Sequence, residues 1–154
     1  MTVKHFVFAA LTMLTACGAP AADAPSSAPS SKPLPAMTDA PSRSYAQNYK
    51  DSALAFCIAK AYQAEPRAKA DAVATAGGLD TWTSYDLENS TGEIPKLVER
   101  YLAREYSSKQ GPDTRLDLMK CIDMYHGKEL AALVKKYVLQ PTHTYNQDNP
   151  PTKP

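Results

Sequence analysis

Apolar side chains in the middle of the chain recur at intervals of three and four residues, and this spacing limits the possible fold more than any other feature. The clearest stripe begins with Leu130, Leu133 and Val134 and continues for one more turn. No segment shows the sustained alternation of apolar and polar residues, rich in β-branched side chains, that is typical of strands. Residues 44–139 therefore predict an all-α domain, a single small bundle of about five to six helices.

Prolines and glycines set the bounds of the expected helices, because proline favours the first turn and glycine the position after the last. Most of these helices carry an apolar stripe on one face, and the stripe is weakest in the alanine-rich second helix. The expected helices are a long first helix around Tyr49–Ala61, one from Pro66 to Ala76 stopped by Gly77-Gly78, one around Leu97–Leu102 with Pro95 in its first turn, one around Leu118–Tyr125 opened by Pro112-Asp113 and closed by Gly127, and one around Leu130–Val138 ended by Pro141.

Residues 1–16 have the features of a bacterial export signal. A short basic start precedes the apolar run Phe6–Leu14, which is too short to span a bilayer, since that takes about 20 residues. The run ends in a Leu-Thr-Ala-Cys sequence that resembles the signal of bacterial lipoproteins, so Cys17 is expected to become the acylated N-terminus. Gly18 after the cysteine favours an outer-membrane address on the periplasmic side. The alternative is cleavage near Ala19–Ala22, which would leave a soluble protein.

The segments on either side of the helical region have compositions that disfavour a packed core. Residues 17–43 are rich in proline, alanine and serine, and Leu34 and Met37 are their only large apolar side chains, so a disordered tether is expected. Such a tether reaches roughly 30 Å as a random coil and about 80 Å as a polyproline helix. Residues 140–154 contain prolines, asparagines and no apolar periodicity, and are expected to form a flexible tail.

The charge of the chain disfavours nucleic acid as a partner. Lys and Arg total 17 against 16 Asp and Glu, which leaves a net charge of +1, whereas nucleic-acid-binding domains carry a strong basic excess or a basic patch. The chain has 9 tyrosines and 3 phenylalanines. Tyrosine suits surfaces that bury against a partner while the hydroxyl stays hydrated, but tyrosines that complete a small core explain the count equally well.

Cys57 and Cys121 are the two cysteines that remain if Cys17 is acylated, and each lies on the apolar stripe of its expected helix. In an exported chain, two such cysteines favour a disulfide, because the periplasm oxidises accessible pairs. The bond would close a long loop and contribute roughly 4 kcal/mol to stability. The alternative is two separate buried thiols.

No pattern in the sequence indicates catalysis, a metal site or a cofactor. Cys121 and His126 are a conceivable nucleophile and base. However, they lack the spacing of three or four residues that places two side chains on one helix face. In addition, a cysteine in a disulfide is not a nucleophile. The other histidine of the exported chain, His143, falls in the expected tail. Metal-binding cysteine or histidine pairs are absent from the sequence, and Gly77-Gly78 is expected to stop a helix rather than to hold a phosphate. The chain is therefore expected not to be an enzyme.

Two stretches carry a resemblance to a known family: Asn48–Ala59, which contains Cys57, and Leu118–Leu130, which contains Cys121. Together with Leu97–Leu102, they resemble the immunity proteins that neutralise peptidoglycan amidase effectors of the type VI secretion system, specifically the fourth amidase-immunity group. The resemblance covers the whole helical region. It implies a periplasmic, homodimeric protein that binds its amidase tightly and obstructs the cysteine–histidine active-site groove. Lipidation and a long tether depart from the plain secreted form of that group.

An inhibitor of this kind needs a rigid scaffold and a protruding polar element rather than chemistry of its own. The segment Thr83–Glu93 lies between two expected helices, is polar and has no apolar stripe, so it is the candidate for that element. An ordinary solvated connection explains the same residues equally well. The alternative function is that of a structural or interaction lipoprotein of the bacterial envelope without an enzyme target. The candidate effector-binding residues are Asp86, Glu88, Asn89, Ser90, Thr91 and Glu93.

Overall fold

Helices account for most of the chain that the structure describes. The structure is a computed structural model, and it describes residues 38–109, 111 and 113–150. The expected signal peptide, Cys17 and most of the expected tether lie outside these residues. Among the described residues there are only isolated β-bridges and no strands, so the all-α prediction is confirmed. The elements are η1 (Ala40–Ser42), α1 (Tyr45–Ala61), α2 (Pro66–Thr81), α3 (Leu87–Ser90), α4 (Glu93–Leu102), α5 (Asp117–His126), α6 (Lys128–Tyr137) and α7 (Tyr145–Asp148).

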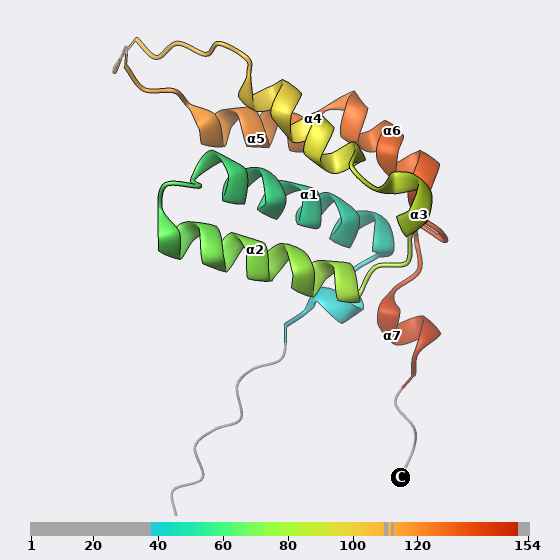
Figure 1. Cartoon of the computed structure of the whole chain (residues 1–154). Coiled ribbons are helices and arrows are strands. Elements are labelled where there is room, and N and C mark those ends of the chain that lie inside the picture. Colours follow the sequence, from blue (N-terminus) through green and yellow to red (C-terminus); the bar gives the residue numbers. More distant parts are fainter. Residues whose placement is uncertain (1–37, 110, 112, 151–154) are drawn as a thin grey trace, which may run out of the picture. The chain divides into compact units, whose positions relative to one another are not determined.

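α1 is the central element of the bundle (Figure 1). α2 packs along one side of α1, and α4, α5 and α6 lie on the other. A helix enclosed in this way must be apolar or small on several faces rather than along one stripe. Alanines supply much of this surface and allow the neighbouring helices to approach closely. The buried apolar residues of α1 are Tyr45, Tyr49, Ala53, Ala55, Cys57 and Ala59.

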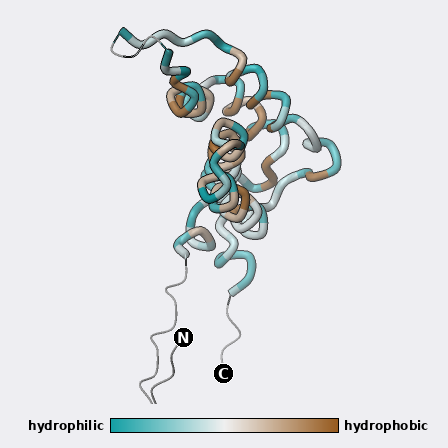
Figure 2. The backbone as a smooth tube through the Cα atoms, turned by 60° about the vertical axis from the view of Figure 1, so that its left-hand side comes forward, coloured by the Kyte–Doolittle hydropathy of each residue, from teal (hydrophilic) through white to brown (hydrophobic). Residues whose placement is uncertain are grey.

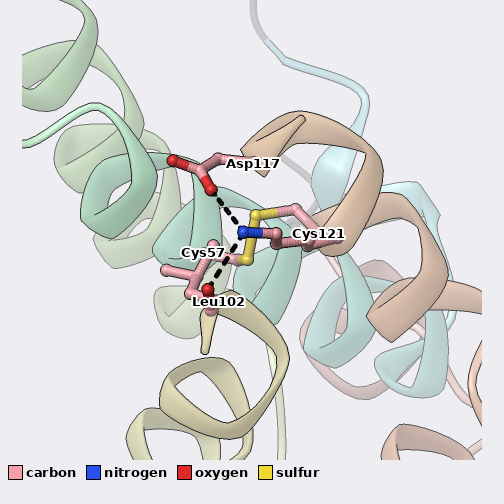
Figure 3. The surroundings of a disulfide bond; sticks show 5 residues. Cys57, Leu102, Asp117 and Cys121 are labelled. Carbon is pink, nitrogen blue, oxygen red and sulfur yellow. Dashed lines mark hydrogen bonds and ion pairs between the residues drawn. A yellow bond between two sulfur atoms is a disulfide. The ribbon is translucent and has the colours of Figure 1, made fainter. Parts of the chain in front are cut away.

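A disulfide joins Cys57 of α1 to Cys121 of α5, with the two Cα atoms 5.7 Å apart, so the predicted bridge is confirmed. Figure 3 shows Asp117 and Leu102 next to this disulfide. The side chain of Lys120, which precedes Cys121 in the sequence, is buried. Its ammonium group donates a hydrogen bond to the carbonyl oxygen of Leu102 at 3.1 Å and pairs with Asp117 at 2.9 Å. These contacts join the end of α4 to the start of α5, where the disulfide also joins α5 to α1.

α2 continues through Gly77-Gly78 to Thr81, so the expectation that these glycines stop the helix is wrong. Neither glycine has the positive φ with which glycine ends a helix. Ala72, Ala76 and Leu79 lie at helical spacing before and after the pair, and all three are buried in the bundle. Packing against α1 therefore outweighs the low helix propensity of glycine, which costs about 1 kcal/mol at each position.

The segment after α6 contains a short helix, α7, within the expected tail. α7 begins with a capping box, in which the side chains of Thr144 and Gln147 each accept a hydrogen bond from the other residue's backbone N–H. The hydroxyl of Tyr45, at the start of α1, donates a hydrogen bond to Asp148 at 2.8 Å. This hydrogen bond attaches α7 to the start of α1.

The helices mix hydrophilic and hydrophobic residues (Figure 2). Within the described ranges, no helix has both the length and the apolar content needed to cross a membrane. α5 begins at Asp117, later than the expected opening at Pro112-Asp113. Its side chains Leu118, Met119 and Ile122 are large, apolar and exposed.

Removing the disulfide should destabilise the bundle. The double variant Cys57→Ala/Cys121→Ala loses a link between residues separated by 64 positions, for which chain entropy predicts a loss of roughly 4 kcal/mol. Urea unfolding followed by circular dichroism measures this change. Dithiothreitol should lower the midpoint of the wild-type protein and leave that of the double variant unchanged. Equal stability of the oxidised and reduced wild-type protein would contradict the expectation.

Candidate functional site

The segment Thr83–Glu93, here called the corner segment, leads from the end of α2 through α3 to the start of α4 (Figure 1). It is fixed to the end of α6, far away in the sequence. An antiparallel bridge pairs Tyr85 with Val138, and the Asp86 backbone N–H donates to the carbonyl oxygen of Tyr137 at 2.8 Å. The corner segment is therefore an ordered turn held against the end of α6.

Asp86 and Asn89 interact with each other within the corner segment. The Asp86 carboxylate caps α3, accepting hydrogen bonds from the Asn89 backbone N–H at 3.0 Å and from its side-chain amide at 2.7 Å. These hydrogen bonds hold the pKa of Asp86 below its usual value, because they stabilise the charged form. The cap orders the single turn of α3 and keeps a negative charge at its start.

Ser90 and Thr91 shape the turn into α4. Their hydroxyls donate to the carbonyl oxygen of Leu87, at 3.3 Å from Ser90 and 2.8 Å from Thr91. Ser90 is buried. Gly92 follows with a φ of 82°, a backbone conformation that glycine adopts without steric cost.

Leu87 and Glu88 are the exposed pair in the middle of the corner segment. The Leu87 side chain is 65% exposed, and Glu88 beside it is exposed as well. Glu93 pairs with Lys96 at 3.0 Å, which lowers the pKa of Glu93. Leu87 is not among the effector-binding residues predicted from the sequence, because a single leucine in a polar stretch is usually a residue that packs inward. Its position between Asp86 and Glu88 was the available signal.

A hollow of about 260 Å³ opens between the corner segment, α1, α2 and the start of α4. Ser90 and Thr91 of the corner segment contribute to its wall, and aromatic and aliphatic side chains, among them Leu87, Ile94 and Pro95, contribute much of the rest. Of the described residues, Asp80 is the only charged one that lines the hollow. Its aromatic lining residues are Tyr49, Phe56 and Tyr85.

Asp80 places a carboxylate near the end of α2. The hydroxyl of Ser52 donates a hydrogen bond to it at 2.9 Å. Partial burial nevertheless raises the pKa of Asp80, since desolvation disfavours the charged form more than the hydrogen bond favours it. No lysine or arginine in the part of the chain that the structure describes lies within ion-pair distance of this carboxylate.

Tyr49 lines the same hollow from α1 and is only 1% exposed. Its ring packs edge-on against that of Tyr85, with centroids 5.3 Å apart. The hydroxyl of Tyr49 is buried and has no hydrogen-bond partner among the described residues, a situation that costs about 1–3 kcal/mol. Burial raises the pKa of Tyr49 to about 12, so the hydroxyl stays protonated at neutral pH.

Residues 47–134 match the family model of Tai4, described as the type VI secretion system (T6SS) amidase immunity protein. This range is more than half of the chain. The chain belongs to the Tai4 family. The family resemblance found in the sequence is confirmed, and the function of the chain is immunity against a T6SS amidase effector. The match extends from α1 into α6, so it includes the corner segment and the hollow beside it.

Solved structures share the fold of this Tai4 family member. One is a chain from a structure described as new type VI-secreted toxins and self-resistance proteins in Serratia marcescens, with a TM-score of 0.66 and 25% identity, covering 77% of this chain and 98% of that one. Another is a chain from the Tae4/Tai4 effector–immunity system of Salmonella typhimurium (selenomethionine variant), with a TM-score of 0.59 and 27% identity, covering 66% and 96%. Comparison with curated proteins gives no match.

Two kinds of catalytic group bear on the described part of this Tai4 family member: a bound metal ion and a cysteine thiolate. The described part contains no group of three or more His, Cys, Asp or Glu side chains that could hold a metal ion. The sulfur of Cys121 is bonded to that of Cys57 and so is not a free thiolate. His126, the base considered for it, packs edge-on against the ring of Tyr125.

Replacing Asp80 by Asn should stabilise the protein at neutral pH. The pKa of Asp80 is raised in the folded chain, so ionisation of this carboxyl weakens the folded state. That penalty is absent below the unfolded pKa of about 3.9 and fully present above the folded pKa. Asp80→Asn should therefore raise Tm at pH 7 and give no gain near pH 3, as measured by thermal unfolding.

The exposed Asp71 of the same helix provides the control. Asp71→Asn should leave Tm unchanged at both pH values, because Asp71 does not line the hollow. A lower Tm for Asp80→Asn at pH 7 would contradict the expectation.

Alanine substitutions at two glycines should have opposite effects. Gly92→Ala places a side chain at a φ of 82° and should destabilise the protein by about 1–2 kcal/mol. Gly77→Ala, within α2 and with nothing within 4 Å of the added Cβ, should stabilise it by about 0.5–1 kcal/mol. Chemical denaturation of both variants measures the difference, and unchanged or increased stability of Gly92→Ala would show that the α4 turn does not require glycine.

Proposed function

We propose that this Tai4 family member protects its cell by binding a peptidoglycan amidase effector and covering the enzyme's cysteine–histidine active-site groove with the corner segment, without catalysing a reaction itself. The observation that carries the proposal is the exposed Leu87 between the carboxylates of Asp86 and Glu88, on a turn that is fixed to α6. An exposed apolar side chain gains free energy when a partner covers it and removes it from water.

The rigidity of the corner segment supports this mode of inhibition. The cap at Asp86 orders α3, and the bridge between Tyr85 and Val138 attaches the corner segment to α6. Both contacts exist before any partner binds, so little conformational entropy remains to be lost on binding. A preorganised turn can therefore enter a groove at low cost.

The charge of the corner segment supports a partner with a basic groove rim. Asp86, Glu88 and Glu93 contribute three carboxylates, and the sequence of the segment contains no lysine or arginine. Complementary charge across an interface steers association and selects partners. Glu88 is the best placed of the three, because Asp86 is engaged with Asn89 and Glu93 with Lys96.

We further propose that the protein acts in the periplasm, anchored to the outer membrane through a lipid on Cys17. The disulfide between Cys57 and Cys121 supports an oxidising compartment. Residues 17–43, as a tether, would hold the bundle away from the membrane surface.

A homodimer would also cover the exposed apolar side chains of α5, and sedimentation velocity of the purified protein tests this arrangement.

Substitutions in the corner segment should weaken amidase binding without unfolding the protein. Leu87→Ala removes the exposed apolar contact and should reduce affinity about 30-fold, the size of a typical hot-spot effect. Glu88→Lys reverses an exposed charge and should reduce affinity about tenfold, mainly through slower association. Surface plasmon resonance against the amidase that the wild-type protein inhibits measures both effects.

The control is Glu99→Lys, which makes the same charge change at an exposed position of α4 outside the corner segment. It should leave the affinity within about twofold of the wild-type value, as expected for a rim or distant charge. Wild-type affinity in both Leu87→Ala and Glu88→Lys would overturn the role of the corner segment.

A further inference from the structure

We propose that the hollow beside the corner segment receives an arginine side chain of the amidase, which pairs with Asp80. The inference rests on the proposed function and adds to it the chemistry of the group that the partner inserts. Three features of the hollow carry it: an uncompensated carboxylate, an unsatisfied hydroxyl and an aromatic wall.

The carboxylate of Asp80 has no positively charged partner among the described residues. Its only hydrogen bond within the described residues comes from the neutral hydroxyl of Ser52, and the described chain brings no lysine or arginine within ion-pair distance. Partial desolvation raises the pKa of Asp80, in keeping with a carboxylate that no cation pairs with. Because Asp80 remains exposed as a residue, a partner can reach it. An incoming cation would neutralise it.

The hydroxyl of Tyr49 provides a second, independent indication of a ligand. Tyr49 lines the hollow, is 1% exposed and has no partner for its hydroxyl among the described residues. A hydroxyl oxygen accepts hydrogen bonds, and a guanidinium carries five N–H donors in a fixed plane. Asp80 lies near enough to Tyr49 for its charge to raise the pKa of that hydroxyl, so a guanidinium paired with Asp80 would bring N–H donors close to it, whereas an apolar side chain would satisfy neither group.

The size and lining of the hollow favour arginine. The volume of about 260 Å³ is smaller than the roughly 300–1,000 Å³ of pockets that enclose whole small molecules, so one side chain is the better fit. Tyr49, Phe56 and Tyr85 line it with aromatic rings. Guanidinium stacks on such rings, is less strongly hydrated than ammonium and binds carboxylates in a bidentate manner, which lysine does not.

A titration with small probes tests the hollow without the amidase. n-Butylguanidinium chloride, added to the ¹⁵N-labelled protein, should shift the backbone amide signals of Ser52, Asp80 and Gly92 in a saturable way. n-Butylurea, the neutral analogue, should not shift them, and n-butylammonium should bind more weakly than n-butylguanidinium. Asp80→Asn should abolish the shifts, and the control Asp71→Asn should retain them. Equal shifts with the urea, tighter binding of the ammonium or unchanged shifts in Asp80→Asn would overturn the proposal.

Binding of the amidase separates this proposal from the proposed function. Asp80→Asn should reduce affinity for the amidase that the wild-type protein inhibits by about tenfold or more, since it removes one partner of a desolvated charge pair. If Glu88→Lys weakens binding while Asp80→Asn matches the wild type, the arginine site is wrong and the proposed function stands. If the protein binds and inhibits no T6SS amidase, the proposed function fails, and the probe titration still decides whether the hollow binds guanidinium.

Discussion

The enclosure of α1 by the other helices is the constraint on which the rest of the structure depends. α2 covers one side of α1, while α4, α5 and α6 cover the other (Figure 1). Small and aromatic residues on several faces of α1 make this enclosure possible, and the disulfide to Cys121 fixes the relation of α1 to α5. Even α7, which lies after the matched family region, is attached to the start of α1 through Tyr45 and Asp148.

The candidate site is a consequence of this arrangement. Because α2 and α4 lie on opposite sides of α1, the chain between them must cross the end of the bundle, and the corner segment makes that crossing. The bridge to α6 then fixes the crossing, and the space left beside α1 becomes the hollow. The Asp80 carboxylate without a cation and the Tyr49 hydroxyl without a hydrogen-bond partner depart from the usual pairing of polar groups, a departure that is expected at functional sites.

The sequence was sufficient to predict the helical fold and the disulfide, because both follow from local periodicity and from cysteines on apolar stripes. It was not sufficient where distant contacts decide the outcome. Gly77-Gly78 stays helical because neighbouring residues of α2 are buried in the bundle. The pairing of Ser52 with Asp80 joins α1 to α2 and has no sequence signal. α7 could have been predicted from the capping-box spacing of Thr144 and Gln147.

A structure of the complex with the inhibited amidase tests the central claim most directly, namely that the protein acts by covering the enzyme's active-site groove. The account predicts that the corner segment lies in the groove, with Leu87 against its apolar floor and the catalytic cysteine closed to substrate. A complex in which the groove is open and the corner segment faces solvent would contradict the account.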